Sequence, residues 1–353
     1  MAESNLQHTN SPLCRLPAIA PRRFEPGLNP RRSHFLTILQ NTWVNGTRLH
    51  YHFLENPPSN RVEEVEIVRK AFAQWKSLDI GLEFQEVQSA PDAEIRISFR
   101  NDGSWSYVGR QALDIIDPRE PTMNFGWSLA TPYGYDTALH EIGHALGLVH
   151  EHQNRNAGIV WNREAVLAYF SAPPNQWSPE EIQHNILDRV QESGSYGSSW
   201  DPDSIMHYPF EAGLINLPAK YRSEPLIPAG GISAVDKSEI RRTYPALSSP
   251  GHNVSLPAFQ SMPIAIDPGQ QLDFSIKPEQ TRDYTIATFG QLDTTMVLFE
   301  VLNGVPRFVA GDDDGGVDRN AQIVQRLTHD REYRLSIRLY FAAVRGDGAL
   351  MMW

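Results

Sequence analysis

The sequence lacks features that mark several classes of protein. It has one cysteine, Cys14, among 353 residues, which excludes an internal disulfide framework because a disulfide needs two thiols. No apolar run approaches the roughly 20 residues that span a bilayer, so we do not expect an integral membrane protein. The polar start of the chain, Met1 to Asn5, is not followed by the hydrophobic segment of a signal peptide.

The sequence also has little clustered positive charge. It carries 31 Lys and Arg against 42 Asp and Glu, a net charge of −11, and its basic pairs are the short Arg22-Arg23 and Arg31-Arg32. These pairs are either exposed surface or processing sites. Because nucleic-acid binding needs a basic patch or stripe, we expect no nucleic-acid partner. The length and the 41% hydrophobic content predict a globular protein of two domains.

The most informative stretch is His140 to Glu151, which reads HEIGHALGLVHE. On a helix, residues four apart lie on one face, so His140 and His144 can bind the same metal ion. Glu141 is adjacent, and in an H-E-x-x-H pattern such a carboxylate is the general base of a zinc hydrolase. The pattern therefore predicts two metal ligands and a catalytic base on one helix.

A third ligand follows the helix. Gly147 can adopt positive φ where the helix ends, and this turn would return His150 to the metal. Three neutral imidazoles leave a coordination position open, which is typical of a catalytic zinc and not of a structural one. The alternative is an ordinary helix with surface histidines. We expect Asp136 to be the N-cap of this helix.

Two further stretches carry a resemblance to a known family. The H-E-x-x-H-x-x-G-x-x-H pattern resembles that of the metzincin metallopeptidases. Ser204 to Tyr208 (SIMHY) is similar to the methionine turn of the astacin branch, and Ser104 to Arg110 (SWSYVGR) is similar to a stretch that astacins carry upstream. The likeness covers roughly Asn41 to Pro245. It implies that Met206 lies beneath the zinc site and that Tyr208 is a movable ligand that stabilises the oxyanion.

This resemblance also implies a fold class and a setting. We expect an α+β protein, with a metzincin-type catalytic domain built on a mixed sheet and a zinc-binding helix. An edge strand of that sheet would pair with extended substrate. Animal astacins have disulfides and this chain has one cysteine, while its Ala145 to Leu148 run is similar to matrixins, so we expect a divergent microbial type. The family implies secretion, whereas the start of the chain has no signal peptide.

Residues 1–35 are rich in Pro, Asn, Ser and Arg and show no periodicity, which predicts an N-terminal extension outside the catalytic core. This extension is a candidate inhibitory propeptide, because a cysteine thiolate is a good zinc ligand. Cys14 would then be a latch on the zinc and the protein a zymogen. The alternative is a solvent-exposed thiol. The sequence around Cys14 departs from the matrixin switch.

We expect the astacin-like domain to span residues 36–246. Periodic apolar residues predict helices at 61–78, 162–170, 178–190 and 234–244. A Pro/Ser/Gly-rich linker follows, and residues 253–353 show strand periodicity, which predicts an all-β sandwich. Gly311 to Gly316 (GDDDGG) is either a Ca²⁺ site or an acidic turn, because Ca²⁺ prefers oxygen ligands but the EF-hand spacing is absent.

The sequence thus predicts a metalloendopeptidase that hydrolyses proteins or peptides with one catalytic Zn²⁺, a metal-activated water and Glu141 as general base. Two alternatives stay open. One is a zinc-containing, non-catalytic binding protein in which the C-terminal domain does the work. The other is a zinc hydrolase that acts on a non-peptide amide or ester.

Overall fold

The protein is described by a computed structural model that covers residues 13–17, 41–43, 45–55, 61–131, 133–189, 199–246, 254–341 and 344–353. Its internal contacts divide the chain into two compact units. The first contains Arg48–Leu78 and Phe84–Glu239; the second contains Ile240–Trp353 with two short earlier stretches. The domain boundaries expected from the sequence stay a prediction. The expected linker and most of the N-terminal extension lie outside the described residues.

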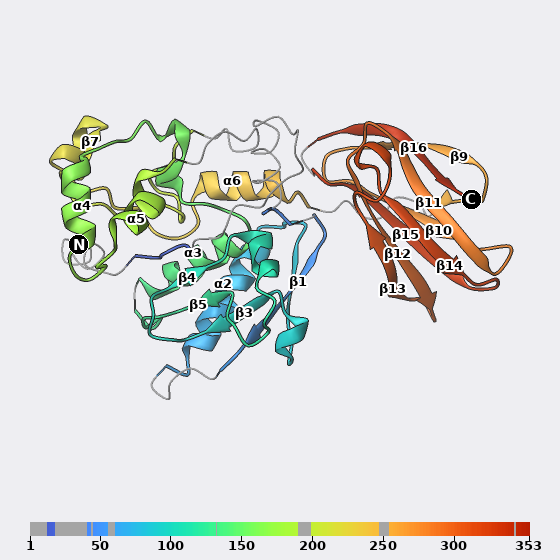
Figure 1. Ribbon diagram of the computed structural model, residues 1–353, viewed down its shortest axis with the longest axis horizontal. Coiled ribbons are helices and arrows are strands. Elements are labelled where there is room, and N and C mark those ends of the chain that lie inside the picture. Colours follow the sequence, from blue (N-terminus) through green and yellow to red (C-terminus); the bar gives the residue numbers. More distant parts are fainter. Residues whose placement is uncertain are drawn as a thin grey trace. The chain divides into compact units, whose positions relative to one another are not determined.

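The first unit is built around a mixed five-stranded sheet in the order β2-β1-β3-β5-β4 (Figure 1). The strands are β1 (Arg48–Phe53), β2 (Glu83–Glu86), β3 (Ile95–Ser98), β4 (Trp105–Ser106) and β5 (Met123–Asn124). Strands β1, β3 and β5 are parallel, whereas β4 runs antiparallel to β5 at one edge. The alternating apolar residues of β1 explain its place in the sheet, because they bury one face of the strand.

Two helices of this unit pack against each other, α2 (Glu64–Lys76) and α3 (Gly134–Ala145). The buried face of α2 presents Phe72 and Trp75. The indole Nε1 of Trp75 donates a hydrogen bond to the backbone oxygen of Leu139 at 3.1 Å. Because this carbonyl belongs to α3, the bond fixes the rotation of the helix that carries the H-E-x-x-H motif.

The remainder of the first unit is a set of short elements that follow α3. They are β6 (Val160–Trp161), α4 (Arg163–Ser171), α5 (Pro179–Ile182), a π-helical turn at Gln183–Leu187, β7 (Ile215–Leu217) and α6 (Ala234–Thr243). Short 3₁₀ turns lie at Ala90–Asp92, Gly109–Asp114, Glu151–Gln153, Arg155–Ala157 and Ala219–Arg222. An apolar cluster around Phe170, Trp177 and Phe210 joins α4, α5, the π-helical turn and β7, and it includes Leu13 and Cys14.

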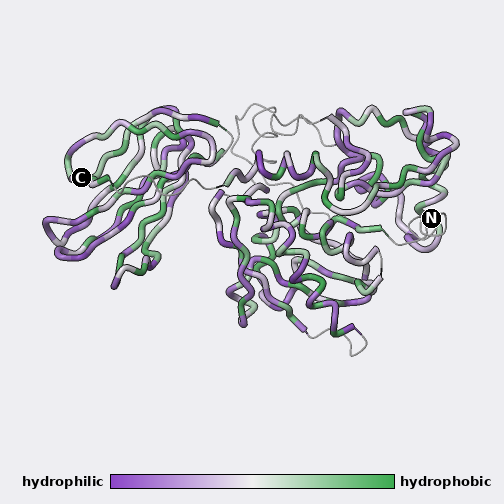
Figure 2. The backbone as a smooth tube through the Cα atoms, turned by 180° about the vertical axis from the view of Figure 1, so that it is seen from behind, coloured by the Kyte–Doolittle hydropathy of each residue, from purple (hydrophilic) through white to green (hydrophobic). Residues whose placement is uncertain are grey.

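The second unit is a β-sandwich of two sheets, β13-β12-β15-β10-β8 and β14-β11-β16-β9 (Figure 1). Its strands are β8 (Val254–Ser255), β9 (Ser261–Ile266), β10 (Gln271–Ile276), β11 (Arg282–Gly290), β12 (Thr294–Leu302), β13 (Val305–Asp312), β14 (Gln322–Leu327), β15 (Glu332–Leu339) and β16 (Gly346–Met352), with a 3₁₀ turn at Val317–Arg319. Hydrophobic and hydrophilic residues alternate along these strands (Figure 2). The inward residues form one core, as the cross-strand pair Phe274 and Leu335 illustrates.

The structure corrects the predicted N-cap of α3 and decides between the two interpretations of residues 311–316. Asp136 is not the N-cap, because α3 begins at Gly134 and Tyr133 precedes it; the Asp136 carboxylate instead accepts a hydrogen bond from the backbone N of Gly231. Calcium at 311–316 is not supported. The Asp312 carboxylate accepts bonds from the amides of Gly315 and Gln322, as an acidic turn requires.

No helix in the described part of the chain is both long and apolar enough to cross a bilayer.

Candidate metal centre and active site

Helix α3 places His140 and His144 on one face, one turn apart, with Glu141 beside them. All three side chains are buried, and Glu141 is 0% exposed. The Nε2 atoms of His140 and His144 lie 3.1 Å apart. This is the local consequence of the i, i+4 spacing that the sequence predicts.

The third imidazole arrives through the turn after α3. Gly147 adopts φ +95°, a conformation that costs a glycine little and an L-residue more. The turn is held by Leu148, whose backbone N donates to the carbonyl of Gly143. It brings the Nε2 atom of His150 to 3.0 Å from that of His144, so three ring nitrogens converge on one point.

The other ring nitrogens define the tautomers. Nδ1 of His140 lies 2.7 Å from the carbonyl oxygen of Ile205, and Nδ1 of His144 lies 2.8 Å from that of Leu148. Since a carbonyl only accepts, each Nδ1 carries the proton and each Nε2 presents a lone pair. Burial lowers the pKa of His140 to about 4 and also lowers the pKa values of His144 and His150. The imidazoles are therefore neutral at pH 7.

The Nε2 lone pairs of His140 and His144 face each other at 3.1 Å, so they cannot hydrogen-bond to each other and repel without a cation between them. Tetrahedral zinc with Zn–N bonds of about 2.0–2.1 Å would hold its nitrogens about 3.3–3.4 Å apart, close to the spacing found. The donor set is thus suited to zinc. Cys14 completes the group, because its thiol and the three histidine nitrogens lie within 4.8 Å of one another.

Residues 204–208 form the turn beneath the three histidines. Met206 is buried against α3, and a Cβ added to Gly143 would lie 2.5 Å from its Sδ. The carboxylate of Asp236 in α6 holds the turn: it accepts bonds from the Ser204 hydroxyl at 2.6 Å and from the Ile205 amide at 2.8 Å. The methionine thus packs against the helix that carries the histidines.

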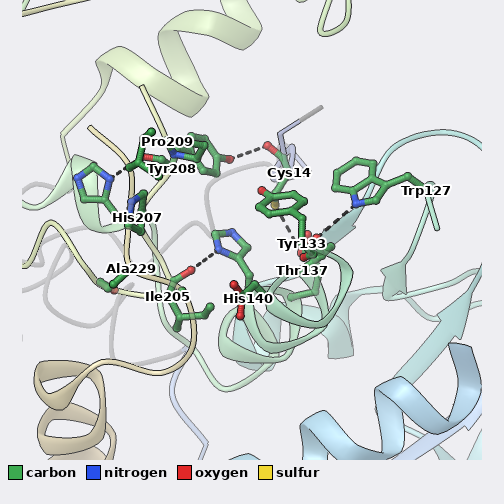
Figure 3. Close-up of a pocket in the computed structure, with 16 residues that line it drawn as sticks. Cys14, Trp127, Tyr133, Thr137, His140, Ile205, His207, Tyr208, Pro209 and Ala229 are labelled. Carbon is green, nitrogen blue, oxygen red and sulfur yellow. Dashed lines mark hydrogen bonds between the residues drawn. The ribbon is translucent and has the colours of Figure 1, made fainter. Parts of the chain in front are cut away.

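Cys14 also belongs to this site, and it lies beside the Tyr208 side chain (Figure 3). Its Sγ lies 3.4 Å from Oε2 of Glu141, and its backbone oxygen accepts a hydrogen bond from the Tyr208 hydroxyl at 2.6 Å. Cys14 is buried, which contradicts the alternative of a solvent-exposed thiol. Burial raises the pKa values of both Cys14 and Tyr208, so thiol and phenol are neutral without a metal.

Glu141 faces a cavity of about 130 Å³. Residues of α3, of the 204–209 turn and of 227–230 line it (Figure 3). Burial raises the pKa of Glu141 to about 8, opposed by the contact from Cys14. Its Oε1 is buried and has no hydrogen-bond partner among the described residues. An unsatisfied buried oxygen beside a cavity is suited to accept a proton from a molecule that enters.

The structure adds residues that the sequence did not single out as part of the site. His152 is buried beside the third histidine: its ring stacks 5.3 Å from that of His150, and its Nε2 contacts the carbonyl of Asn185. Asp236, which supports the methionine turn, lies some thirty residues further along the chain. No local pattern could have identified it, because its role depends only on where α6 packs.

A metzincin fold is defined by a helix with two histidines, a third histidine after a glycine turn and a methionine beneath them. The model of the Astacin family, a family of peptidases, matches residues 36–216, just over half of the sequence, and the chain belongs to this family. The solved structure of myroilysin agrees: it is 32% identical, covers 58% of this chain and 96% of its own, and has a TM-score of 0.51. The sequence prediction of an astacin-like metzincin is confirmed.

Two curated relatives come from Caenorhabditis elegans. Zinc metalloproteinase nas-7 is 27% identical over 153 residues, which are 40% of this chain and 34% of that protein. Zinc metalloproteinase nas-36 is 28% identical over 138 residues, 39% of this chain and 19% of that protein. The chain therefore spans about a third or less of the length of these relatives.

Proposed function

We propose that this protein is a zinc-dependent endopeptidase that cleaves proteins or peptides. The observation that carries the proposal is the convergence of the Nε2 atoms of three neutral imidazoles beside the buried carboxylate of Glu141. Membership of a peptidase family supports the same reaction class. His140, His144 and His150 would hold the zinc, and Met206 would support the helix from below.

Bound zinc would polarise the scissile carbonyl and lower the pKa of water from 15.7 to about 7. Glu141 would take the proton of the attacking water on its unpartnered Oε1 and then give that proton to the leaving amine. Burial raises the pKa of this carboxylate in the metal-free site, and its position beside the three histidines suits it to both transfers. Tyr208, once released from the carbonyl of Cys14, would donate its hydroxyl hydrogen to the oxyanion.

Cys14 would be a latch that keeps the enzyme inactive. With the three imidazoles, its thiolate would give a closed four-ligand site, which is the arrangement of structural rather than catalytic zinc. The thiol also occupies the approach to Glu141 at 3.4 Å, and the same residue engages Tyr208. One residue thus contacts the proposed base and the proposed oxyanion donor, and we infer that both would be released when residues 13–17 leave the cleft.

The decisive experiment is cleavage of denatured casein by the zinc-loaded Cys14→Ser protein. We expect cleavage that stops with a chelator, returns with Zn²⁺ and is absent in the Cys14→Ser, Glu141→Ala protein although its zinc content is unchanged. A protein that binds zinc but cleaves nothing would instead favour a non-catalytic binding role. Hydrolysis of small esters or amides without cleavage of peptides would favour a non-peptide hydrolase.

A further inference from the structure

We propose that Asn175, Glu181 and Asn185 form a recognition surface for substrate, and that Glu181 selects a basic side chain next to the bond to be cut. This inference rests on the proposed peptidase function, because it names the groups that would bind the peptide at that site. The argument starts from residues 13–17, which carry Cys14 to the three histidines of the metal centre.

The backbone of this segment is held from both sides of the cleft. On one side, the amide of Arg15 donates to the carbonyl of Ser104, immediately before edge strand β4. On the other side, the amide of Leu13 donates to Asn175 Oδ1 at 3.2 Å and that of Leu16 to Asn185 Oδ1 at 3.0 Å. Backbone contacts do not depend on the identity of the side chain, so other extended peptides can make them as well.

Asn185 is held in place before any peptide arrives. Its side chain is 1% exposed, and its Nδ2 donates to the carbonyl of Glu181 at 3.0 Å. Its own carbonyl accepts from His152 Nε2. The Oδ1 acceptor is therefore fixed toward the cleft, and binding a peptide amide there loses little conformational entropy.

Glu181 is also preorganised, in this case by a capping box. Its Oε2 accepts a hydrogen bond from the backbone N of Ser178 at 2.8 Å, and its Oε1 contacts the guanidinium of Arg15 at 2.7 Å. The bond from Ser178, and to a lesser extent Arg15, lowers the pKa of Glu181. A fixed, ionised carboxylate thus faces the residue that follows Cys14.

Leu13, the residue before Cys14, lies in an apolar environment. Leu13 is 7% exposed and belongs to the apolar cluster that contains Trp177 and Ile186. The surface therefore accommodates an apolar side chain on one side of the metal centre and a basic side chain on the other. A substrate has to replace residues 13–17, because Cys14 fills the approach to Glu141, and it would then meet the same groups.

The test compares two peptides that differ only beside the scissile bond, one with Arg and one with Glu, in the Cys14→Ser protein. We expect kcat/KM to favour Arg by about fivefold, the range of a partly exposed ion pair, and Glu181→Gln to reduce this ratio toward one. Glutamine keeps the capping box, so the variant removes charge and not the helix start. Glu180→Gln, on the same turn and exposed, is the matched control and should leave the ratio unchanged.

An equal ratio in the parent and Glu181→Gln proteins would overturn this inference while cleavage itself upheld the peptidase proposal. If no peptide is cleaved, the peptidase proposal fails, and the recognition surface is then tested by peptide binding alone. Fluorescence anisotropy would measure the affinity of both peptides for the zinc-loaded Cys14→Ser, Glu141→Ala protein. A preference for Arg that Glu181→Gln abolishes would support the recognition surface, and equal affinities would overturn it.

Discussion

The thiol of Cys14 lies 3.4 Å from a carboxylate oxygen of Glu141, although the two residues are 127 positions apart in the chain. The same cysteine accepts the hydrogen bond of Tyr208 through its backbone oxygen. The inhibitory segment and a substrate would therefore occupy the same space beside the three histidines. Substitutions of residues in this space can separate the inhibitory role from the catalytic one.

Cys14→Ser tests the latch. A serine hydroxyl is a much weaker zinc ligand than a thiolate, so we expect the unprocessed chain to gain activity. A gain of at least about tenfold corresponds to a lost interaction of about 1.4 kcal/mol. The measurement is the initial rate of casein cleavage before any proteolysis of residues 1–35, which mass spectrometry would verify. Unchanged latency would show that Cys14 is not a latch.

Tyr208→Phe tests the oxyanion donor. In the Cys14→Ser background we expect kcat to fall by about 10²–10³-fold, the effect of losing one such donor. KM and zinc content should change little, because a role confined to the transition state does not alter ground-state binding. Steady-state kinetics and atomic absorption measure both quantities. A normal kcat would show that Tyr208 only anchors Cys14.

Gly143→Ala tests the packing of α3 on the methionine turn. The added Cβ would lie 2.5 Å from Sδ of buried Met206, so we expect a loss of stability of about 1–3 kcal/mol from overpacking. The higher helix propensity of alanine would offset up to about 1 kcal/mol. Chemical denaturation measures the free energy of unfolding. In a Met206→Ala background the same change should cost less, and an equal cost there would refute the proposed clash.

Asp293 gives the second unit a pH-dependent stability. Burial raises its pKa from 3.8 to about 6, while Arg319 opposes the shift. Between these values the folded state holds a proton that the unfolded state has lost, so stability falls as the pH rises from about 4 to 6 and is then constant. The side chain is partly exposed, so after allowance for solvent screening we expect only about 1 kcal/mol.

Asp293→Asn should remove this part of the pH dependence and stabilise the second unit at pH 7. Calorimetry at pH 4.5 and pH 7 measures it, and the difference between the two proteins isolates Asp293 from other carboxylates. Parallel pH profiles for parent and variant would contradict the assignment.

Local chemistry was enough to predict the metal-binding helix. His140 and His144 share a face because of the 3.6-residue period, and Gly147 marks the turn because glycine tolerates positive φ. The helix predicted from residue 178 starts there for the same kind of reason, since all partners of its capping box lie within one turn. The alternating strands of the sandwich likewise follow from a two-residue period.

Other features were not readable, because they depend on contacts between distant segments. Asp136 has the chemistry of an N-cap, yet α3 begins before it and its carboxylate binds Gly231. The predicted helix after Ser178 contains four α-helical residues and continues as a π-helical turn, in which Asn185 is buried. Packing decided both outcomes over local preference.

The sequence by itself determined the chemistry of the centre: which side chains can bind zinc, which can accept a proton, and that a single thiol exists. Only the tertiary structure decided that the thiol lies beside Glu141, that Asp236 supports the methionine turn and that Asn185 points into the cleft. Spacing within one helix is fixed by backbone geometry, whereas these proximities arise from burial of apolar surface between segments far apart in the chain, which no local pattern encodes.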